Sequence, residues 1–197
     1  TQSRSSAASD VYKRQNFLRI LYLLLTIRQT DIFIHQQRRE YIMCGIVGYV
    51  GPKDCSDVLV SALTKLEYRG YDSAGIAVFG KNGIETVKTK GKLKNLVDKM
   101  AVEGKPEGHV GIGHTRWATH GEPSDVNSHP HSGARVTIVH NGIIENYIEL
   151  KEFLTSKGRT FLSDTDTEVV AQLLDYKYNG NPLETIDSVC LLYTSDA

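Results

Sequence analysis

The stretch MCGIVGYVGP, residues 43–52, joins a candidate nucleophile to a candidate strand. Ile46 to Val50 is rich in β-branched residues and ends in a Gly-Pro pair, which predicts a short strand followed by a turn. Cys44 stands directly after Met43. Removal of an initiator methionine would make Cys44 the N-terminal residue, so we expect the native start of the protein at Met43.

An N-terminal cysteine carries a thiol and a free α-amine in one residue. The amine, with a pKa of about 7.7–8.0, can accept a proton near neutral pH. A thiol with a pKa of about 8.5 needs such a base to become a nucleophile. Cys44 is therefore a candidate nucleophile that needs no separate histidine; the alternative is a small buried residue that opens a strand. In the chain as printed, 43 residues precede Cys44, so its nitrogen belongs to an amide, and we expect that form to be inactive by this route.

The patterns that follow predict a layered α+β fold. Apolar residues recur with helical spacing at 54–66, 93–102, 146–156 and 165–178, and strand patterns occur at 73–79, 84–90, 110–114 and 136–140. An Asn-Gly turn at 82–83 joins two of the strands into a hairpin. Thr165 and Glu168 have the spacing of a capping box. Because helices and hairpins are mixed without regular βαβ alternation, we expect α+β rather than a doubly wound parallel sheet.

Composition narrows the class of protein. The chain has 197 residues, a formal net charge of +0, 40% hydrophobic and 23% charged residues. These values fit one globular domain and exclude a disordered chain. A zero net charge argues against nucleic acid or an anionic membrane as the main partner. Three cysteines are too few for a disulfide scaffold, and we expect a cytoplasmic location.

The two ends of the chain differ from its middle. Ser5–Gln15 reads SSAASDVYKRQ and Cys190–Ala197 reads CLLYTSDA. Both can be encoded by opposite strands of one DNA word, which resembles a sequencing-library adapter. We therefore interpret residues 1–42 as adapter and untranslated DNA read in frame, 43–189 as the domain, and 190–197 as adapter.

An apolar run at Phe17–Ile27 leaves two alternatives open for the first segment, a signal peptide and a genuine helix. The run is shorter than the roughly 20 residues of a membrane span. No small-residue cleavage site follows it before Met43. We favour the reading as untranslated DNA.

Four further segments combine charged, aromatic and glycine residues at the predicted ends of helices and strands. They are LEYRGYDSAG (66–75), HTRWATHG (114–121), HNGIIEN (140–146) and SDTDTE (163–168). Arg116 could bind a carboxylate through two N–H groups. The Asn141 side chain and the next backbone N–H could receive an oxyanion. Asp166 could pair with an ammonium group.

Structural alternatives exist for the same residues. Arg116 and Asp166 could form an ion pair with each other, and Asn-Gly pairs are common in turns. Histidines 114, 120, 129 and 131 suggest a metal site, but no cysteine or acidic cluster completes a ligand set, and their spacing fits no zinc motif. We expect no metal and no cofactor.

Together with residues 43–48, the four segments resemble the glutaminase domain of glutamine–fructose-6-phosphate aminotransferases, a class II glutamine amidotransferase domain. The five motifs occur in the family's order, and the resemblance extends from Met43 to about Ser188. It implies the N-terminal-nucleophile hydrolase fold, a four-layer αββα sandwich, incomplete here at its C-terminus.

The resemblance also implies roles for the matching residues. Cys44 would attack the side-chain amide of glutamine and form a thioester. Asn141, through its side chain, and Gly142, through its backbone N–H, would form the oxyanion hole. Arg116 would hold the α-carboxylate of glutamine, and Asp166 its α-ammonium group.

Four more residues receive supporting roles by the same resemblance. Thr119 and His120 would assist in binding the carboxylate, Trp117 would lie on a loop that closes over glutamine, and Arg69 would order the surroundings of the nucleophile. The ammonia would serve glucosamine 6-phosphate synthesis from fructose 6-phosphate, which binds to an isomerase domain that this chain lacks. We expect the full-length enzyme to be a homo-oligomer.

Two other classes of protein remain as alternatives. One is the glutaminase domain of another amidotransferase, such as amidophosphoribosyltransferase or asparagine synthetase. The motifs YRGY (68–71) and RWATH (116–120) look more like the hexosamine enzyme. The other is a secreted, non-enzymatic binding domain, which requires Phe17–Ile27 to be a real signal.

Overall fold

A computed structural model describes residues 44–192 and 195–196 of the chain. Its largest sheet has four antiparallel strands in the order β1-β4-β2-β3. These strands are β1 (Gly45–Val50), β2 (Ser73–Gly80), β3 (Gly83–Lys90) and β4 (Val110–Arg116). A 3-10 turn at Glu67–Arg69 precedes β2. The predicted hairpin is confirmed, with Gly80 opposite Gly83 at its turn.

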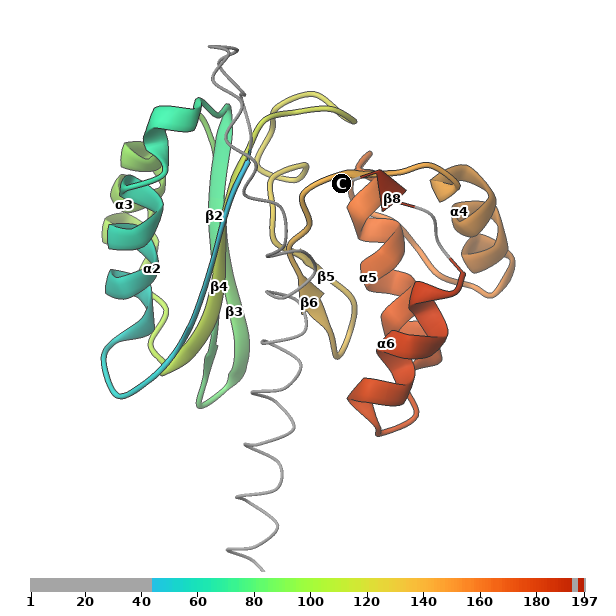
Figure 1. Ribbon diagram of the computed structural model, residues 1–197. Coiled ribbons are helices and arrows are strands. Elements are labelled where there is room, and N and C mark those ends of the chain that lie inside the picture. Colours follow the sequence, from blue (N-terminus) through green and yellow to red (C-terminus); the bar gives the residue numbers. More distant parts are fainter. Residues whose placement is uncertain (1–43, 193–194, 197) are drawn as a thin grey trace, which may run out of the picture.

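Two helices, α2 (Cys55–Thr64) and α3 (Leu93–Glu103), cover one face of this sheet (Figure 1). Asp54 caps α2 by accepting a hydrogen bond from the Ser56 N–H at 3.0 Å. The aliphatic side chains that α2 turns toward the sheet, Leu59 and Leu63, are fully buried. Burial of such side chains is the main contribution to the stability of this half of the molecule.

The opposite side of the sheet faces smaller strands and three helices (Figure 1). The strands form two pairs, β5 (His131–Ser132) with β6 (Thr137–Ile138), and β7 (Ile143–Ile144) with β8 (Ser195–Asp196). The helices are α4 (Tyr147–Ser156), α5 (Asp166–Lys177) and α6 (Pro182–Cys190). A second apolar core lies among these helices and strands, centred on α5. The succession of helices, sheet, short strands and helices fits the predicted layered α+β class.

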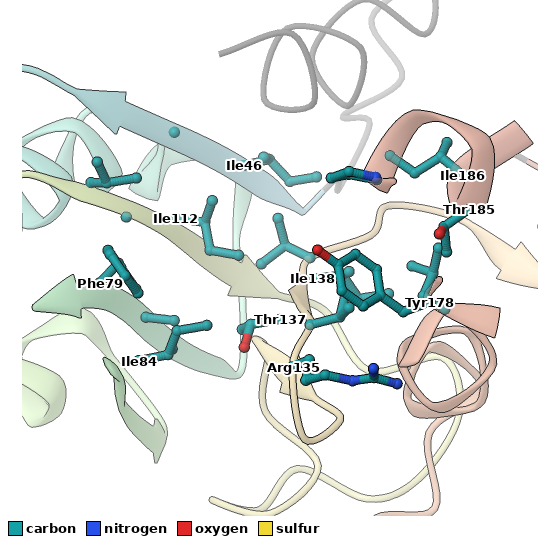
Figure 2. Close-up of a pocket in the computed structure, with 18 of the residues that line it drawn as sticks. Ile46, Phe79, Ile84, Ile112, Arg135, Thr137, Ile138, Tyr178, Thr185 and Ile186 are labelled. Carbon is teal, nitrogen blue, oxygen red and sulfur yellow. The ribbon is translucent and has the colours of Figure 1, made fainter. Parts of the chain in front are cut away.

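A cavity of about 260 Å³ lies between the main sheet and this second layer (Figure 2). Its walls include Ile46 and Ile112 from the sheet, Ile138 from β6, and Tyr178 and Ile186 from the helical side. The walls are mostly aliphatic, and Cys44 is not among the lining residues. The candidate nucleophile thus lies outside this apolar cavity.

Alternation along β4 decides which side chains reach the second layer. A Cβ placed on Gly111 or Gly113 would lie against residues of α2, so these positions face the helices. Successive residues of a strand point to opposite faces. His114 therefore faces the second layer, and its ring stacks on His129 there.

Some local expectations were wrong. The strand expected at 136–140 is reduced to Thr137–Ile138, and α6 was not predicted. Thr165 occupies the N-cap of α5 but makes no side-chain capping bond, because its hydroxyl lies 3.0 Å from His131 Nε2. Glu168 instead accepts hydrogen bonds from the backbone N–H groups of residues 162 and 163. The interpretations of residues 1–42 lie outside the described residues.

No helix within the described part is long and apolar enough to cross a lipid bilayer.

A buried carboxylate ties the hairpin between β5 and β6 to α5. Asp175 is 1% exposed and accepts hydrogen bonds from the Arg135 backbone N–H at 2.8 Å and from Arg159 Nη1 at 2.5 Å. The Arg159 guanidinium and the Arg135 N–H hold the pKa of this carboxyl below its ordinary value. Asp175 therefore links three segments that are distant in sequence.

Asp175 also forms ion pairs with the guanidinium groups of Arg135 and Arg159. We expect Asp175→Asn to lower the free energy of unfolding by about 2–4 kcal/mol, because it leaves these two cationic groups without their buried anion. Asp98→Asn is the matched control, since Asp98 pairs with Lys94 on an exposed helix face and should change stability by about 0.5 kcal/mol or less. Urea unfolding of both variants at neutral pH measures the difference. Equal effects would contradict a stabilising role for the buried carboxylate.

Candidate active site

The pairing of β1 with β4 brings Cys44 to the end of β4. Gly45 lies opposite Thr115, and its N–H donates to Thr115 Oγ1 at 3.1 Å. The backbone N–H of Trp117 donates to Cys44 Sγ at 3.1 Å. A Cβ on Gly45 would lie 2.8 Å from Thr115 Oγ1 and 2.9 Å from Leu66 Cδ1, so this close approach requires glycine.

The Cys44 thiol is partly buried, and burial raises its pKa. The Trp117 N–H and the Arg116 guanidinium oppose this effect, while the Asp72 carboxylate adds to it. The net direction is upward, so the thiol is protonated at neutral pH. A base is therefore needed before this sulfur can act as a nucleophile.

Arg116 ends β4 with a buried guanidinium, 4% exposed. Its Nη2 donates to the backbone carbonyls of His120 and, at 3.2 Å, Gly121. Its Nη1 is buried and has no hydrogen-bond partner within the described residues. A buried cationic N–H without an acceptor is costly, so this position suits an anionic ligand. The alternative ion pair of Arg116 with Asp166 does not occur in the described structure.

Asn141 reaches the candidate nucleophile from the loop before β7. Its Nδ2 donates to the backbone carbonyl of Cys44 at 3.0 Å, and its Oδ1 lies 2.8 Å from His114 Nε2. An amide nitrogen carries two hydrogens, so one remains after the bond to the carbonyl. The next residue, Gly142, has a φ of +142°, a conformation that favours glycine.

Asp166 is the first residue of α5 and is 4% exposed. Its Oδ2 accepts a hydrogen bond from the Ile144 N–H at 2.7 Å, which ties α5 to β7. A carboxylate at a helix N-terminus is stabilised by the helix dipole. Asp166 is thus a buried, oriented anion that can pair with a cation.

Three of the remaining predicted residues lie on the loop after β4, and the fourth lies before β2. Trp117 is 44% exposed, and Thr119 is also exposed. The His120 ring meets Tyr147 edge-on, with ring centroids 5.3 Å apart. Arg69 ends the 3-10 turn before β2.

The chain is similar in sequence to known proteins over most of its described residues. A sequence profile described as a glutamine amidotransferase domain matches residues 97–185. The chain is 59% identical over 146 residues to glutamine–fructose-6-phosphate aminotransferase (isomerizing) of Clostridium tetani, and 60% identical over 146 residues to that of Clostridium perfringens. The enzyme of the same name from Thermus thermophilus is 56% identical over 147 residues. Over these residues the chain is similar to glutamine amidotransferase domains.

The match covers 73% of this chain and 24% of each of these three relatives. The chain therefore spans about a quarter of the length of the curated relatives it matches.

Two solved structures have a similar fold. Glutamine phosphoribosylpyrophosphate amidotransferase from B. subtilis, complexed with ADP and GMP, has a TM-score of 0.65 and 24% identity over 76% of this chain and 33% of its own. A second structure, described as the allosteric regulatory enzyme of purine biosynthesis, has a TM-score of 0.66 at 24% identity with the same coverage. These likenesses confirm the predicted N-terminal-nucleophile fold.

Sequence reasoning missed three residues of this candidate site. Asp72 Oδ2 accepts from the Ala118 N–H at 2.6 Å and so holds the loop after β4. Thr115 binds the Gly45 N–H, and His114 contacts Asn141. All three residues stood in the quoted motifs, but nothing local indicated their partners.

The histidines considered as metal ligands pack against one another instead. The rings of His114 and His129 stack at 4.2 Å, and those of His129 and His131 meet edge-on at 4.7 Å. Within the described part, no group of three or more His, Cys, Asp or Glu side chains could hold a metal ion.

Burial keeps this histidine cluster neutral. It lowers the pKa of His114 to about 4 and that of His131 to about 2, and it lowers the pKa of His129 well below 6.5. Asn141 and the His140 carbonyl partly oppose the effect on His114. The unfolded chain takes up these protons near pH 6.5, whereas the folded domain resists them.

We therefore expect the domain to lose stability as the pH falls from about 6.5 to about 4, by about 3 kcal/mol from His114 alone. Above about pH 6.5 these histidines are neutral in both states and do not reduce the free energy of unfolding. Below that pH the unfolded chain binds their protons more readily, so the free energy of unfolding falls. Asp125 and Asp175, whose pKa values are lowered from 3.8, contribute losses only below about pH 4. Urea midpoints at about pH 7 and about pH 4.5 measure the effect, and equal midpoints would contradict it.

Proposed function

We propose that this domain hydrolyses the side-chain amide of L-glutamine, with Cys44 as the nucleophile. The observation that carries the proposal is the convergence of the Cys44 thiol and the Asn141 side-chain amide at one end of the main sheet. The sequence identity to glutamine–fructose-6-phosphate aminotransferases supports the same reaction. The chemistry requires that the residues before Cys44 are removed, which frees its α-amine.

The proposed reaction has two halves. In the first, the α-amine takes the thiol proton, and sulfur attacks the amide carbon of glutamine. Asn141 Nδ2–H and the Gly142 N–H then stabilise the oxyanion. The C–N bond breaks as the α-ammonium returns its proton to the leaving nitrogen, which departs as ammonia. In the second half, water attacks the thioester at Cys44, and glutamate and the thiol are released.

The same proposal gives the α-substituents of glutamine their partners. Arg116 Nη1, which has no hydrogen-bond partner among the described residues, supports a bond to the α-carboxylate, with Thr119 and His120 assisting. Asp166 would pair with the α-ammonium group. Trp117 lies on an exposed loop segment beside the thiol and would cover bound glutamine. Arg69 would order the surroundings of Cys44.

In the longer protein, we propose that the ammonia aminates fructose 6-phosphate to give glucosamine 6-phosphate. The relatives named as fructose-6-phosphate aminotransferases are longer proteins, and this chain covers 24% of their length. The sugar phosphate would bind outside this chain. Homo-oligomeric assembly, a cytoplasmic location, and glutamine hydrolysis without metal or cofactor complete the proposal.

Labelling tests the proposal directly. A chain expressed from Met43, checked for cooperative unfolding, is treated with a glutamine-mimicking electrophile and analysed by mass spectrometry. We expect loss of the methionine and labelling of Cys44 that glutamine blocks. Cys55 is fully buried, and burial raises its pKa to about 12, so it serves as the internal control. A folded chain that begins at Cys44 and remains unlabelled would refute the proposed function.

We expect Asn141→Ala to lower kcat for glutamine hydrolysis by roughly 10²–10³, the usual loss for one oxyanion donor. KM should change little, because the amide acts mainly on the tetrahedral intermediate. Steady-state glutamate production by the folded variant measures both constants. A fall in kcat of less than about threefold would remove Asn141 from this role.

A further inference from the structure

The Asn141 side chain can act as an oxyanion donor in only one of its two orientations. Its oxygen and nitrogen are nearly the same size, so the shape of the site does not distinguish them. With Nδ2 toward Cys44, the amide offers a hydrogen to the developing oxyanion. With Oδ1 there, it would present a lone pair and repel the same charge.

Two backbone carbonyls, which can only accept hydrogen bonds, determine the orientation. The His140 carbonyl lies 3.2 Å from His114 Nε2, so Nε2 carries the hydrogen. The Asn141 atom that lies 2.8 Å from this N–H must then be the oxygen. At the other end of the amide, the Cys44 carbonyl at 3.0 Å requires the nitrogen. Both constraints select the same orientation.

His114 is itself held in place. Its side chain is 1% exposed, it belongs to the central strand β4, and its ring stacks on His129 with an interplanar angle of 18°. Its Nδ1 is buried and has no hydrogen-bond partner in the part of the chain that the structure describes. Nε2 is therefore the ring nitrogen through which His114 forms its hydrogen bonds.

We propose that His114 is a positioning residue that holds the Asn141 amide with its nitrogen toward Cys44. The inference rests on the proposed glutaminase function and adds to it the residue that orients the oxyanion donor. Within the described residues, His114 makes no hydrogen bond to the Cys44 thiol. Its loss is expected to act only through Asn141, which lies 27 residues away in the sequence.

A matched pair of variants tests this role in the protein with Cys44 at its N-terminus. His114→Gln keeps an N–H donor near the position of Nε2, whereas His114→Met has similar length and no donor. We expect His114→Met to lower kcat for glutamine hydrolysis by about tenfold to 10² with KM changed less than about threefold. His114→Gln should restore kcat to within about fivefold of the unmodified protein. Alkylation of Cys44 by iodoacetamide, which needs no oxyanion donor, should be unchanged in both.

A double-mutant cycle separates positioning from general damage. If His114 acts through Asn141, then His114→Met combined with Asn141→Ala should lose no more than about threefold beyond Asn141→Ala alone. His129→Phe is a control: it keeps a ring stacked on His114 and does not alter the hydrogen bonds of His114 Nε2, so it should retain kcat. Multiplicative losses in the double variant, or equal losses in His114→Gln and His114→Met, would overturn the proposal.

Two further outcomes are distinguishable. If His114→Met does not unfold cooperatively, His114→Gln still decides, because a folded His114→Gln that loses tenfold or more in kcat contradicts the role. If the unmodified protein is labelled at Cys44 and hydrolyses glutamine while folded His114→Met is fully active, only the positioning role fails. If the unmodified protein is neither labelled at Cys44 nor able to hydrolyse glutamine, the proposed function is wrong, and the positioning role that rests on it is wrong as well.

Discussion

The antiparallel register of β1 on β4 is the constraint on which the candidate site depends. Because Gly45 lies opposite Thr115, Cys44 must lie beside the residues that follow β4. The Trp117 N–H then reaches Cys44 Sγ at 3.1 Å. A slip of one residue within β4 would turn His114 and its neighbours to the opposite face. Sheet register thus brings the Cys44 thiol to the end of β4 that carries Arg116, and Asn141 reaches Cys44 from the loop before β7.

Burial sets the electrostatics of this site. The Arg116 guanidinium is 4% exposed with its Nη1 unsatisfied in the described structure, and Asp166 is an equally buried carboxylate that binds the Ile144 N–H. The two do not form an ion pair with each other. A zwitterionic ligand would offer an acceptor to the first and a cation to the second, and the low local dielectric would strengthen both contacts.

Local patterns predicted the main elements because each pattern lies within one segment. The hairpin, the helices that cover the sheet and the helix that begins at Asp166 all agree with the structure. The expected capping box was wrong, because the Thr165 hydroxyl contacts His131 of β5 and Glu168 accepts a hydrogen bond from the Ser163 N–H. The helix Pro182–Cys190 was not predicted. In the first case a tertiary contact replaced the expected local hydrogen bond. In the second, the segment was too short for a clear local pattern.

The sequence by itself determined the chemical groups, their order and the elements beside them. These groups are a cysteine directly after a methionine, an arginine at a strand end, an Asn-Gly pair and an aspartate at a helix start. Only the tertiary structure decided their partners. It joined His114 to Asn141, turned Arg116 to loop carbonyls instead of Asp166, and gave the Cys44 sulfur a backbone donor. The physical reason is range: periodicity reports the faces and ends of single elements, whereas hydrogen bonds between distant segments depend on register and packing.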